Sequence, residues 1–201
     1  MEPKKEECAF KLAEENGGYV ATKDLKQAGL NVYDIKVLLE EGKLERIKHG
    51  FYRWTETQHE YHDMTEAARL VPSGVFCLFS ALAWHELTTH IPKEHTIAIP
   101  NKAHKPVLPG YPPIKLYYFS DARYVTGVEN IKLNGQLIKI YDLEKTVCDA
   151  VYYRNKIGRD IVKEVMENYV GKRAKNIQRL MGYAETLRVA TMLKKYLEVL
   201  L

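Results

Sequence analysis

The stretch GKLERIKHGFYRW, residues 42–54, decides how we interpret the fold of this chain. Cations and large apolar residues alternate on both sides of the pair His49-Gly50. A Gly-containing pair between two extended runs is typical of a β-hairpin with a two-residue turn. The sequence therefore predicts a short hairpin that carries unusually many cations and aromatic rings.

A two-residue turn at 49–50 fixes which side chains share a face of the hairpin, because directly opposed residues lie on the same side. It places Arg46 opposite Arg53, two like charges that repel unless an anion or solvent screens them. The predicted cationic face holds Arg46, Lys48, Phe51 and Arg53, and the predicted packing face holds Ile47, Tyr52 and Trp54. A different turn length would break this register.

Helical periodicity and end signals predict three helices before the hairpin, over residues 5–16, 23–29 and 32–42. We expect Thr22 to cap the second helix and Asn31 to cap the third. The third helix combines two stripes at helical spacing: Val32, Ile35, Leu38 and Leu39 as the buried one, and Tyr33, Lys36, Val37 and Glu40 as the exposed one.

Two short helices joined by a tight turn and followed by a basic hairpin are typical of a winged helix-turn-helix. In that arrangement the third helix enters a major groove, and the hairpin lies along phosphates or in the adjacent minor groove. Asn31, Tyr33 and Lys36 are the candidates for contact with base edges. The acidic Glu40 and Glu41 at the far end of the helix should stay away from phosphates. The alternative, for the helices taken alone, is a small structural bundle.

The chain beyond the hairpin reads as a small mixed α/β domain with a helical tail, so the fold class as a whole is α+β. Two alternating runs, at 95–100 and 114–120, indicate strands, and Asn134-Gly135 between two further runs predicts a type I′ hairpin. Asp142 is expected to cap a helix, and more helices follow near 159–170, 172–182 and 185–200. We expect two domains, residues 1–58 and 59–201.

Composition is that of an ordinary globular protein, with 201 residues, of which 46% are apolar and 28% are charged. The net charge of +4 is uneven: residues 151–201 carry 11 Lys or Arg and 5 Asp or Glu, whereas residues 1–54 are balanced. Cys8, Cys77 and Cys148 are widely spaced and read as reduced thiols. No apolar run approaches the length of a membrane span, so we expect a cytoplasmic protein without membrane contact.

The candidate catalytic and metal-binding patterns each have a plainer interpretation. The run HELTTH places His85 and His90 five residues apart, about 140° around a helix, so they cannot share one zinc ion as a zinc-protease motif does. Asp142, Glu144 and Asp149 cluster, but Asp142 is explained as a cap and the other two as a solvated helix face. We therefore expect no enzyme, no metal and no cofactor.

Two parts of the sequence resemble two parts of a known protein family, and they follow each other in the same order as in that family. GGYVATKDLKQAGLNVYDIKVLLEEGKLERIKHGFYRW resembles the N-terminal winged helix of the abortive-infection type IV antitoxins, the AbiEi-like regulators. CLFSALAWHELT, HTIAIP and GQLIKIYDLEKTVCDAVYYRNKIGRDIVKEVMENYV resemble that family's C-terminal domain. The resemblance implies a non-enzymatic antitoxin that binds double-stranded DNA at repeats upstream of its own operon, represses that operon and counteracts a nucleotidyltransferase-like toxin.

The resemblance also implies which residues contact DNA: Thr22, Lys23, Lys26, Asn31, Tyr33, Lys36, Lys48, His49 and Arg53, to which the cationic hairpin face adds Arg46. The tail offers a second candidate basic surface: Arg154, Lys156, Arg159, Lys172, Arg173 and Lys175. A solvated helix face is the alternative for that set. Two other functions stay open, a stand-alone winged-helix regulator whose C-terminal domain senses or oligomerises, and a nucleic-acid-processing enzyme.

Overall fold

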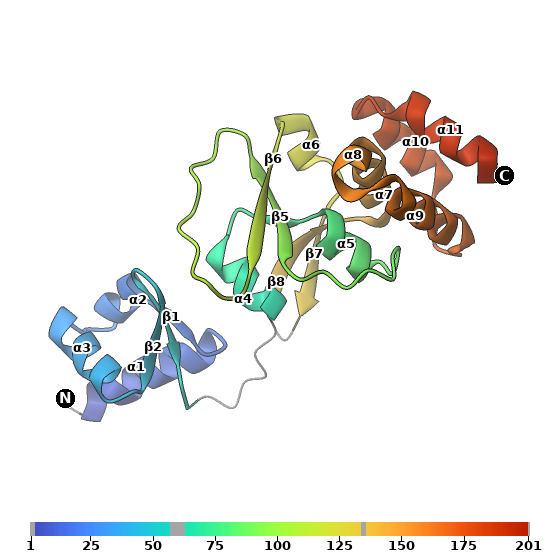
Figure 1. The fold of residues 1–201 in the computed structure, drawn as a ribbon. Helices are drawn as coiled ribbons and strands as arrows, with labels where there is room; N and C mark the ends of the chain where they lie inside the picture. Colours follow the sequence, from blue (N-terminus) through green and yellow to red (C-terminus); the bar gives the residue numbers. More distant parts are fainter. Residues whose placement is uncertain (1–2, 57–62, 134–135, 201) are drawn as a thin grey trace. The chain divides into compact units, whose positions relative to one another are not determined.

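The computed structural model describes residues 3–56, 63–133 and 136–200 (Figure 1). For residues 199 and 200 it describes the backbone only. The chain divides into two compact units, one in the N-terminal part and one that begins at Asp63. Both units combine helices with strands, so the predicted α+β class is confirmed. The domain boundary expected after residue 58 lies outside the described residues.

The first unit packs three helices against a three-stranded antiparallel sheet with the strand order β1-β3-β2. Its elements are α1 (Pro3–Glu15), β1 (Tyr19–Ala21), α2 (Thr22–Gln27), α3 (Val32–Glu40), β2 (Leu44–Lys48) and β3 (Phe51–Trp54). One apolar core joins them, in which Leu25, Leu38 and Trp54 are fully buried. The ring of Phe10 meets Trp54 edge-on, 5.5 Å between centroids, which fixes α1 against the sheet.

A capping box starts α3 where the sequence predicts it. The Asn31 side-chain oxygen accepts a hydrogen bond from the Asp34 backbone N–H at 2.9 Å, and the Asp34 carboxylate accepts one from the Asn31 N–H at 2.9 Å. The same carboxylate accepts from Lys5 Nζ at 3.0 Å, which ties α1 to α3. The prediction that Thr22 caps α2 is wrong, because Thr22 is the first residue of that helix. The capping position belongs to Ala21, whose side chain makes no capping hydrogen bond.

The hairpin has the predicted turn but not the predicted register. Lys48 lies opposite Phe51, as expected for a turn at 49–50. The register then shifts between Arg46 and Lys48, and beyond it the pairs are Arg46 with Tyr52, Glu45 with Arg53 and Leu44 with Trp54. A β-bulge of this kind adds one residue to one strand. The predicted opposition of Arg46 and Arg53, and the cationic face built on it, are therefore wrong.

One residue of the predicted buried stripe of α3 is on the surface. Ile35 and Leu38 are buried as expected, but Val32 is 68% exposed. It occupies the first position of the helix and does not belong to the apolar core that Ile35 and Leu38 join. Tyr33, predicted to face outward, is 72% exposed. The beginning of α3 thus presents an aliphatic and an aromatic side chain to solvent.

The second unit contains a five-stranded mixed sheet with the order β6-β5-β4-β8-β7, and helices α7 to α11 gather beside it (Figure 1). Its strands are β4 (Val75–Phe76), β5 (His95–Pro100), β6 (Ile114–Phe119), β7 (Val128–Leu133) and β8 (Gln136–Tyr141). Its helices are α4 (Asp63–Leu70), α5 (Leu78–Trp84), α6 (Asp121–Val125), α7 (Leu143–Tyr152), α8 (Arg154–Ile157), α9 (Arg159–Gly171), α10 (Ile177–Thr186) and α11 (Ala190–Leu200).

Most of the elements predicted for this unit are present. The strands expected at 95–100 and 114–120 are β5 and β6, which pair in parallel. The strands β7 and β8 are neighbours, while the predicted turn at Asn134-Gly135 lies outside the described residues. The helix expected over 172–182 begins later, at Ile177. All three cysteines are free thiols, as predicted.

Helix α7 contradicts the expectation of a solvated acidic face. Asp142 does cap it, since its carboxylate accepts from the Lys145 backbone N–H at 2.7 Å. Glu144 and Asp149, however, are buried along with Lys145. The Asp149 carboxylate contacts Arg123 Nη1 at 2.7 Å on one oxygen and Lys145 Nζ on the other. Because α7 packs against several other helices of this unit, its buried charged side chains have partners within the protein instead of being solvated.

Candidate nucleic-acid interface

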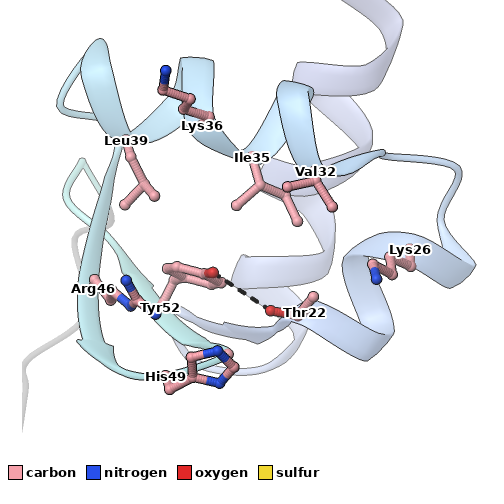
Figure 2. Close-up of a pocket in the computed structure, with 10 residues that line it drawn as sticks. Thr22, Lys26, Val32, Ile35, Lys36, Leu39, Arg46, His49 and Tyr52 are labelled. Carbon is pink, nitrogen blue, oxygen red and sulfur yellow. Dashed lines mark hydrogen bonds between the residues drawn. The ribbon is translucent and has the colours of Figure 1, made fainter.

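A hollow of about 410 Å³ opens between α3 and the β2–β3 hairpin of the first unit (Figure 2). Its lining comes from every segment that surrounds it: Thr22 and Lys26 of α2, Val32, Ile35, Lys36 and Leu39 of α3, Arg46 of β2, His49 and Gly50 of the turn, and Tyr52 of β3. The hollow therefore marks the place where the predicted groove helix and the predicted hairpin face each other.

The polar residues of this lining are basic ones together with the hydroxyl groups of Thr22 and Tyr52. Lys26, Lys36, Arg46 and His49 contribute to it, and none of the lining residues is acidic. Figure 2 shows Lys36 on α3 and Arg46 and His49 on the hairpin, on opposite sides of the hollow. Lys36 Nζ also lies 3.4 Å from the Glu40 carboxylate, an exposed pair of the kind that contributes little. The rim of the hollow is thus arranged to attract an anion.

Most of the wall of the hollow is apolar. Ile35 and Tyr52 are buried at its back, and Leu39 and Val32 extend the apolar surface along α3. The Thr22 hydroxyl donates a long hydrogen bond, 3.5 Å, to the Tyr52 hydroxyl. These contacts join the hairpin to α2 and α3.

The turn of the hairpin is fixed by its backbone. The Thr22 N–H donates to the Gly50 carbonyl oxygen at 2.8 Å, which joins the start of α2 to the turn. Gly50 has φ +73°, a left-handed conformation in which a side chain would be strained. The same glycine lets the chain reverse directly beside Thr22. The positions of His49 and Arg46 relative to α2 follow from this link.

Five of the ten predicted DNA-contacting residues meet at this hollow: Thr22, Lys26, Lys36, Arg46 and His49. Two others, Lys23 and Tyr33, are exposed on α2 and α3 without lining it. The sequence reasoning did not include Val32, Ile35, Leu39, Gly50 and Tyr52, which complete the lining. The apolar residues among them were predicted from the spacing of apolar and polar residues, but only as residues that pack in the core.

The three remaining predicted residues are engaged within the unit. The side-chain oxygen of Asn31 caps α3. Lys48 is half-buried, with its ammonium 5.8 Å from the centre of the Phe51 ring, and burial lowers the pKa of Lys48. Arg53 Nη2 contacts Glu45 Oε2 at 2.5 Å. Arg46 therefore offers a more available charge on the hairpin than Arg53 does.

The second candidate basic surface occupies α8, the start of α9 and the segment between α9 and α10: Arg154, Lys156, Arg159, Lys172, Arg173 and Lys175. Some of its cations have partners within the second unit. Lys172 Nζ lies 3.5 Å from Glu86, and Lys156 Nζ lies 5.4 Å from the centre of the Tyr153 ring. Whether this set contacts nucleic acid stays a prediction.

The residues of the HELTTH run have structural contacts. His85 Nε2 lies 2.7 Å from the Tyr141 carbonyl oxygen, and the His90 ring packs on Phe79. Within residues 3–56, 63–133 and 136–200, no three His, Cys, Asp or Glu side chains are grouped so that they could hold a metal ion. Of the helices in those same ranges, none combines the length and apolar character that crossing a membrane requires.

The part of the chain that contains the hollow is similar to a known protein family. Residues 9–55 match the family described as "Transcriptional regulator, AbiEi antitoxin". No curated protein matches the chain. The matched segment includes α2, α3 and the whole hairpin, so every residue that lines the hollow lies within it. The match does not extend to the C-terminal segments, so their resemblance to the family stays a prediction. Over residues 9–55 the chain is thus similar to that family of antitoxin transcriptional regulators.

Proposed function

We propose that the first unit is a winged helix-turn-helix that binds double-stranded DNA at repeats upstream of its own operon and represses that operon. The observation that carries this proposal is the hollow between α3 and the hairpin, around which Lys26, Lys36, Arg46 and His49 gather without an acidic neighbour in the lining. Phosphate contacts of this kind supply most of the affinity of a DNA-binding protein. The family match over the same residues supports the same function.

In this proposal α3 is the groove helix and the β2–β3 hairpin is the wing. A major groove admits one helix, and the exposed side of α3, with Tyr33 and Lys36, would face the base edges. Arg46 and His49 would contact phosphates beside that groove. The other proposed contacts are Thr22, Lys23, Lys26, Asn31, Lys48 and Arg53, of which Asn31 and Arg53 contribute less because their side chains are already engaged.

We assign the antitoxin activity to the second unit and place the protein in the cytoplasm, with a nucleotidyltransferase-like toxin as its functional partner. The description of the matched family as an antitoxin supports this assignment. The hollow and its cations belong to the first unit, which leaves the second unit for a separate task. We assign no catalytic role to either unit.

A pair of matched lysines tests the DNA-binding site. Lys36 and Lys11 each form an exposed pair with a glutamate one helical turn away, and their side chains are 69% and 67% exposed. Gel-shift titrations of the chain's own upstream DNA at two salt concentrations should show weaker binding for Lys36→Ala and Arg46→Ala. Each lost phosphate contact should also flatten the slope of log K against log salt by about 0.9.

Lys11→Ala removes a lysine of the same kind outside the hollow, so it should leave both the affinity and the slope unchanged. Equal affinities for wild type, Lys36→Ala and Arg46→Ala would overturn the site assignment. A wild-type protein that does not shift the upstream DNA at low salt would overturn the proposed DNA binding itself.

The full-length double variant Lys36→Ala/Arg46→Ala tests the division of labour. Both positions are exposed and belong to the first unit, so the second unit should keep its fold. We expect this protein to lose repression of a reporter driven by its upstream region but to rescue growth against the toxin as the wild type does. Loss of rescue by a variant with wild-type circular dichroism would contradict the assignment of the antitoxin activity.

A further inference from the structure

Most of the side chains that usually contact base edges are absent from α3, and Asn31 at its start is already hydrogen-bonded within the protein. The helix contains no Arg and no Gln. Asn31 directs its side-chain oxygen at the Asp34 N–H, so it cannot offer that oxygen together with its amide N–H to an adenine. Asp34 is buried and bonded to Asn31 and Lys5. The side chains of Asn31 and Asp34 are therefore committed to the capping box of the helix.

What the start of α3 does present is Val32, which is apolar, and Tyr33, whose aromatic ring carries one hydroxyl group. Val32 is 68% exposed and Tyr33 is 72% exposed. Val32 is also one wall of the hollow, where it continues the apolar surface of Ile35 and Leu39, as Figure 2 shows. The N-terminal residues of a groove helix are the ones that contact base edges. Arg46, which lines the same hollow from the hairpin, places positive charge where a flanking phosphate would lie.

The major groove offers one apolar group, the C5-methyl group of thymine. We infer that Val32 is a specificity-determining residue that contacts a thymine methyl group when α3 lies in the groove. This inference rests on the proposed DNA binding and deepens it, since it names the chemical group that the helix recognises. Phosphate contacts around the hollow give affinity in this arrangement, and Val32 gives selectivity for sites with thymine at one position.

Uracil in place of thymine tests the inference without knowledge of the operator. Amplifying the upstream region with dUTP instead of dTTP removes every methyl group and keeps both hydrogen-bonding edges of each base. Full-length wild-type protein should bind the uracil DNA more weakly, by about fourfold for each methyl group that it buries. The comparison uses one fragment, one salt concentration and the two forms of DNA.

A double-mutant cycle separates contact with Val32 from a general change in DNA shape. The variant Val32→Ala should bind thymine DNA more weakly than wild type does and lose most of the discrimination against uracil DNA, whereas Val32→Ile should keep it. Val125→Ala is the matched control, because Val125 is 67% exposed but belongs to the second unit. It should behave as wild type on both forms of DNA.

The outcomes separate this inference from the proposed function. If wild-type protein shifts both DNA forms equally, or if Val32→Ala discriminates as strongly as wild type, the role of Val32 is overturned while DNA binding stands. If wild-type protein shifts neither form at low salt, the proposed function fails and the inference fails with it. Discrimination that disappears in Val32→Ala and persists in Val125→Ala supports the inference.

Discussion

Arg53 lies opposite Glu45 in the β2–β3 hairpin, and its Nη2 contacts the Glu45 Oε2 at 2.5 Å. The carboxylate offsets the positive charge of this arginine. The hairpin therefore carries less free charge than its composition indicates. Arg46, which lies opposite Tyr52 and lines the hollow, has no acidic residue directly across from it.

Replacing Glu45 by Gln should strengthen DNA binding. The change removes the ion pair between Glu45 and Arg53 and a negative charge from the hairpin. Attraction to phosphate should rise, and the slope of log K against log salt should steepen by about 0.9 if one phosphate contact is added. A salt series of fluorescence-anisotropy titrations on the upstream DNA measures this. The control is Glu7→Gln on α1, where the glutamate pairs with Lys11 and is similarly exposed. An unchanged slope in Glu45→Gln would show that Arg53 does not reach phosphate.

The hairpin also shows how far sequence patterns reach. The turn at 49–50 could be predicted because its signal is local. The bulge after it depends on packing, since it brings Leu44 opposite Trp54 and buries both, whereas the predicted register would have set Glu45 opposite Trp54. A comparison of alternative registers for apolar and opposite-charge pairing would have favoured the observed one. Such a comparison could have found Arg46 as the available cation.

Asn31→Ala should destabilise the first unit by about 1 kcal/mol, because the first turn of α3 loses its side-chain cap. Asn31→Ser supplies another capping oxygen and should restore most of this stability. Urea unfolding followed by the fluorescence of the buried Trp54, in a Trp84→Phe background, measures both. If Asn31 acts as a cap and not as a base reader, Asn31→Ser should also keep wild-type DNA affinity. A large loss of affinity in a stable Asn31→Ser protein would restore Asn31 as a base reader.

Acid should remove the contribution of Asp34. The hydrogen bond from the Asn31 N–H, and then the one from Lys5, lower the pKa of Asp34 below its ordinary value of 3.8. A depressed folded-state pKa gives stability that is complete above pH 3.8 and is lost as the pH falls through the lower folded value. The variant Asp34→Asn should therefore be less stable than wild type at pH 7, and the difference should shrink below pH 3.8.

The same unfolding assay, repeated at pH 7 and in acid, checks this dependence. Glu14→Gln serves as the control, because Glu14 is an exposed glutamate in the same unit. Its difference from wild type should stay small at both pH values. A constant gap between Asp34→Asn and wild type across the acid range would contradict the role of the Asp34 charge.

The core of the second unit lies beyond what sequence patterns could show. The cap at Asp142 follows from local spacing, and it is present. The burial of Asp149 does not follow, because its partner Arg123 is 26 residues away and the two meet only when α6 and α7 pack together. A charged residue on a helix is usually solvated, and the exceptions depend on such distant partners. Buried ion pairs therefore have to be read from the fold.

Asp149→Asn should cost about 3–5 kcal/mol of unfolding free energy, since it leaves two buried cations without their shared counter-charge. The side chains of Arg123 and Lys145 are 7% and 0% exposed, so water cannot replace the carboxylate. Urea unfolding of full-length protein, followed by the fluorescence of Trp84 in a Trp54→Phe background, reports on the second unit. Asp160→Asn removes an exposed carboxylate from α9 and should change little. An Asp149→Asn protein as stable as Asp160→Asn would show that the ionic cluster does not hold α6 and α7 together.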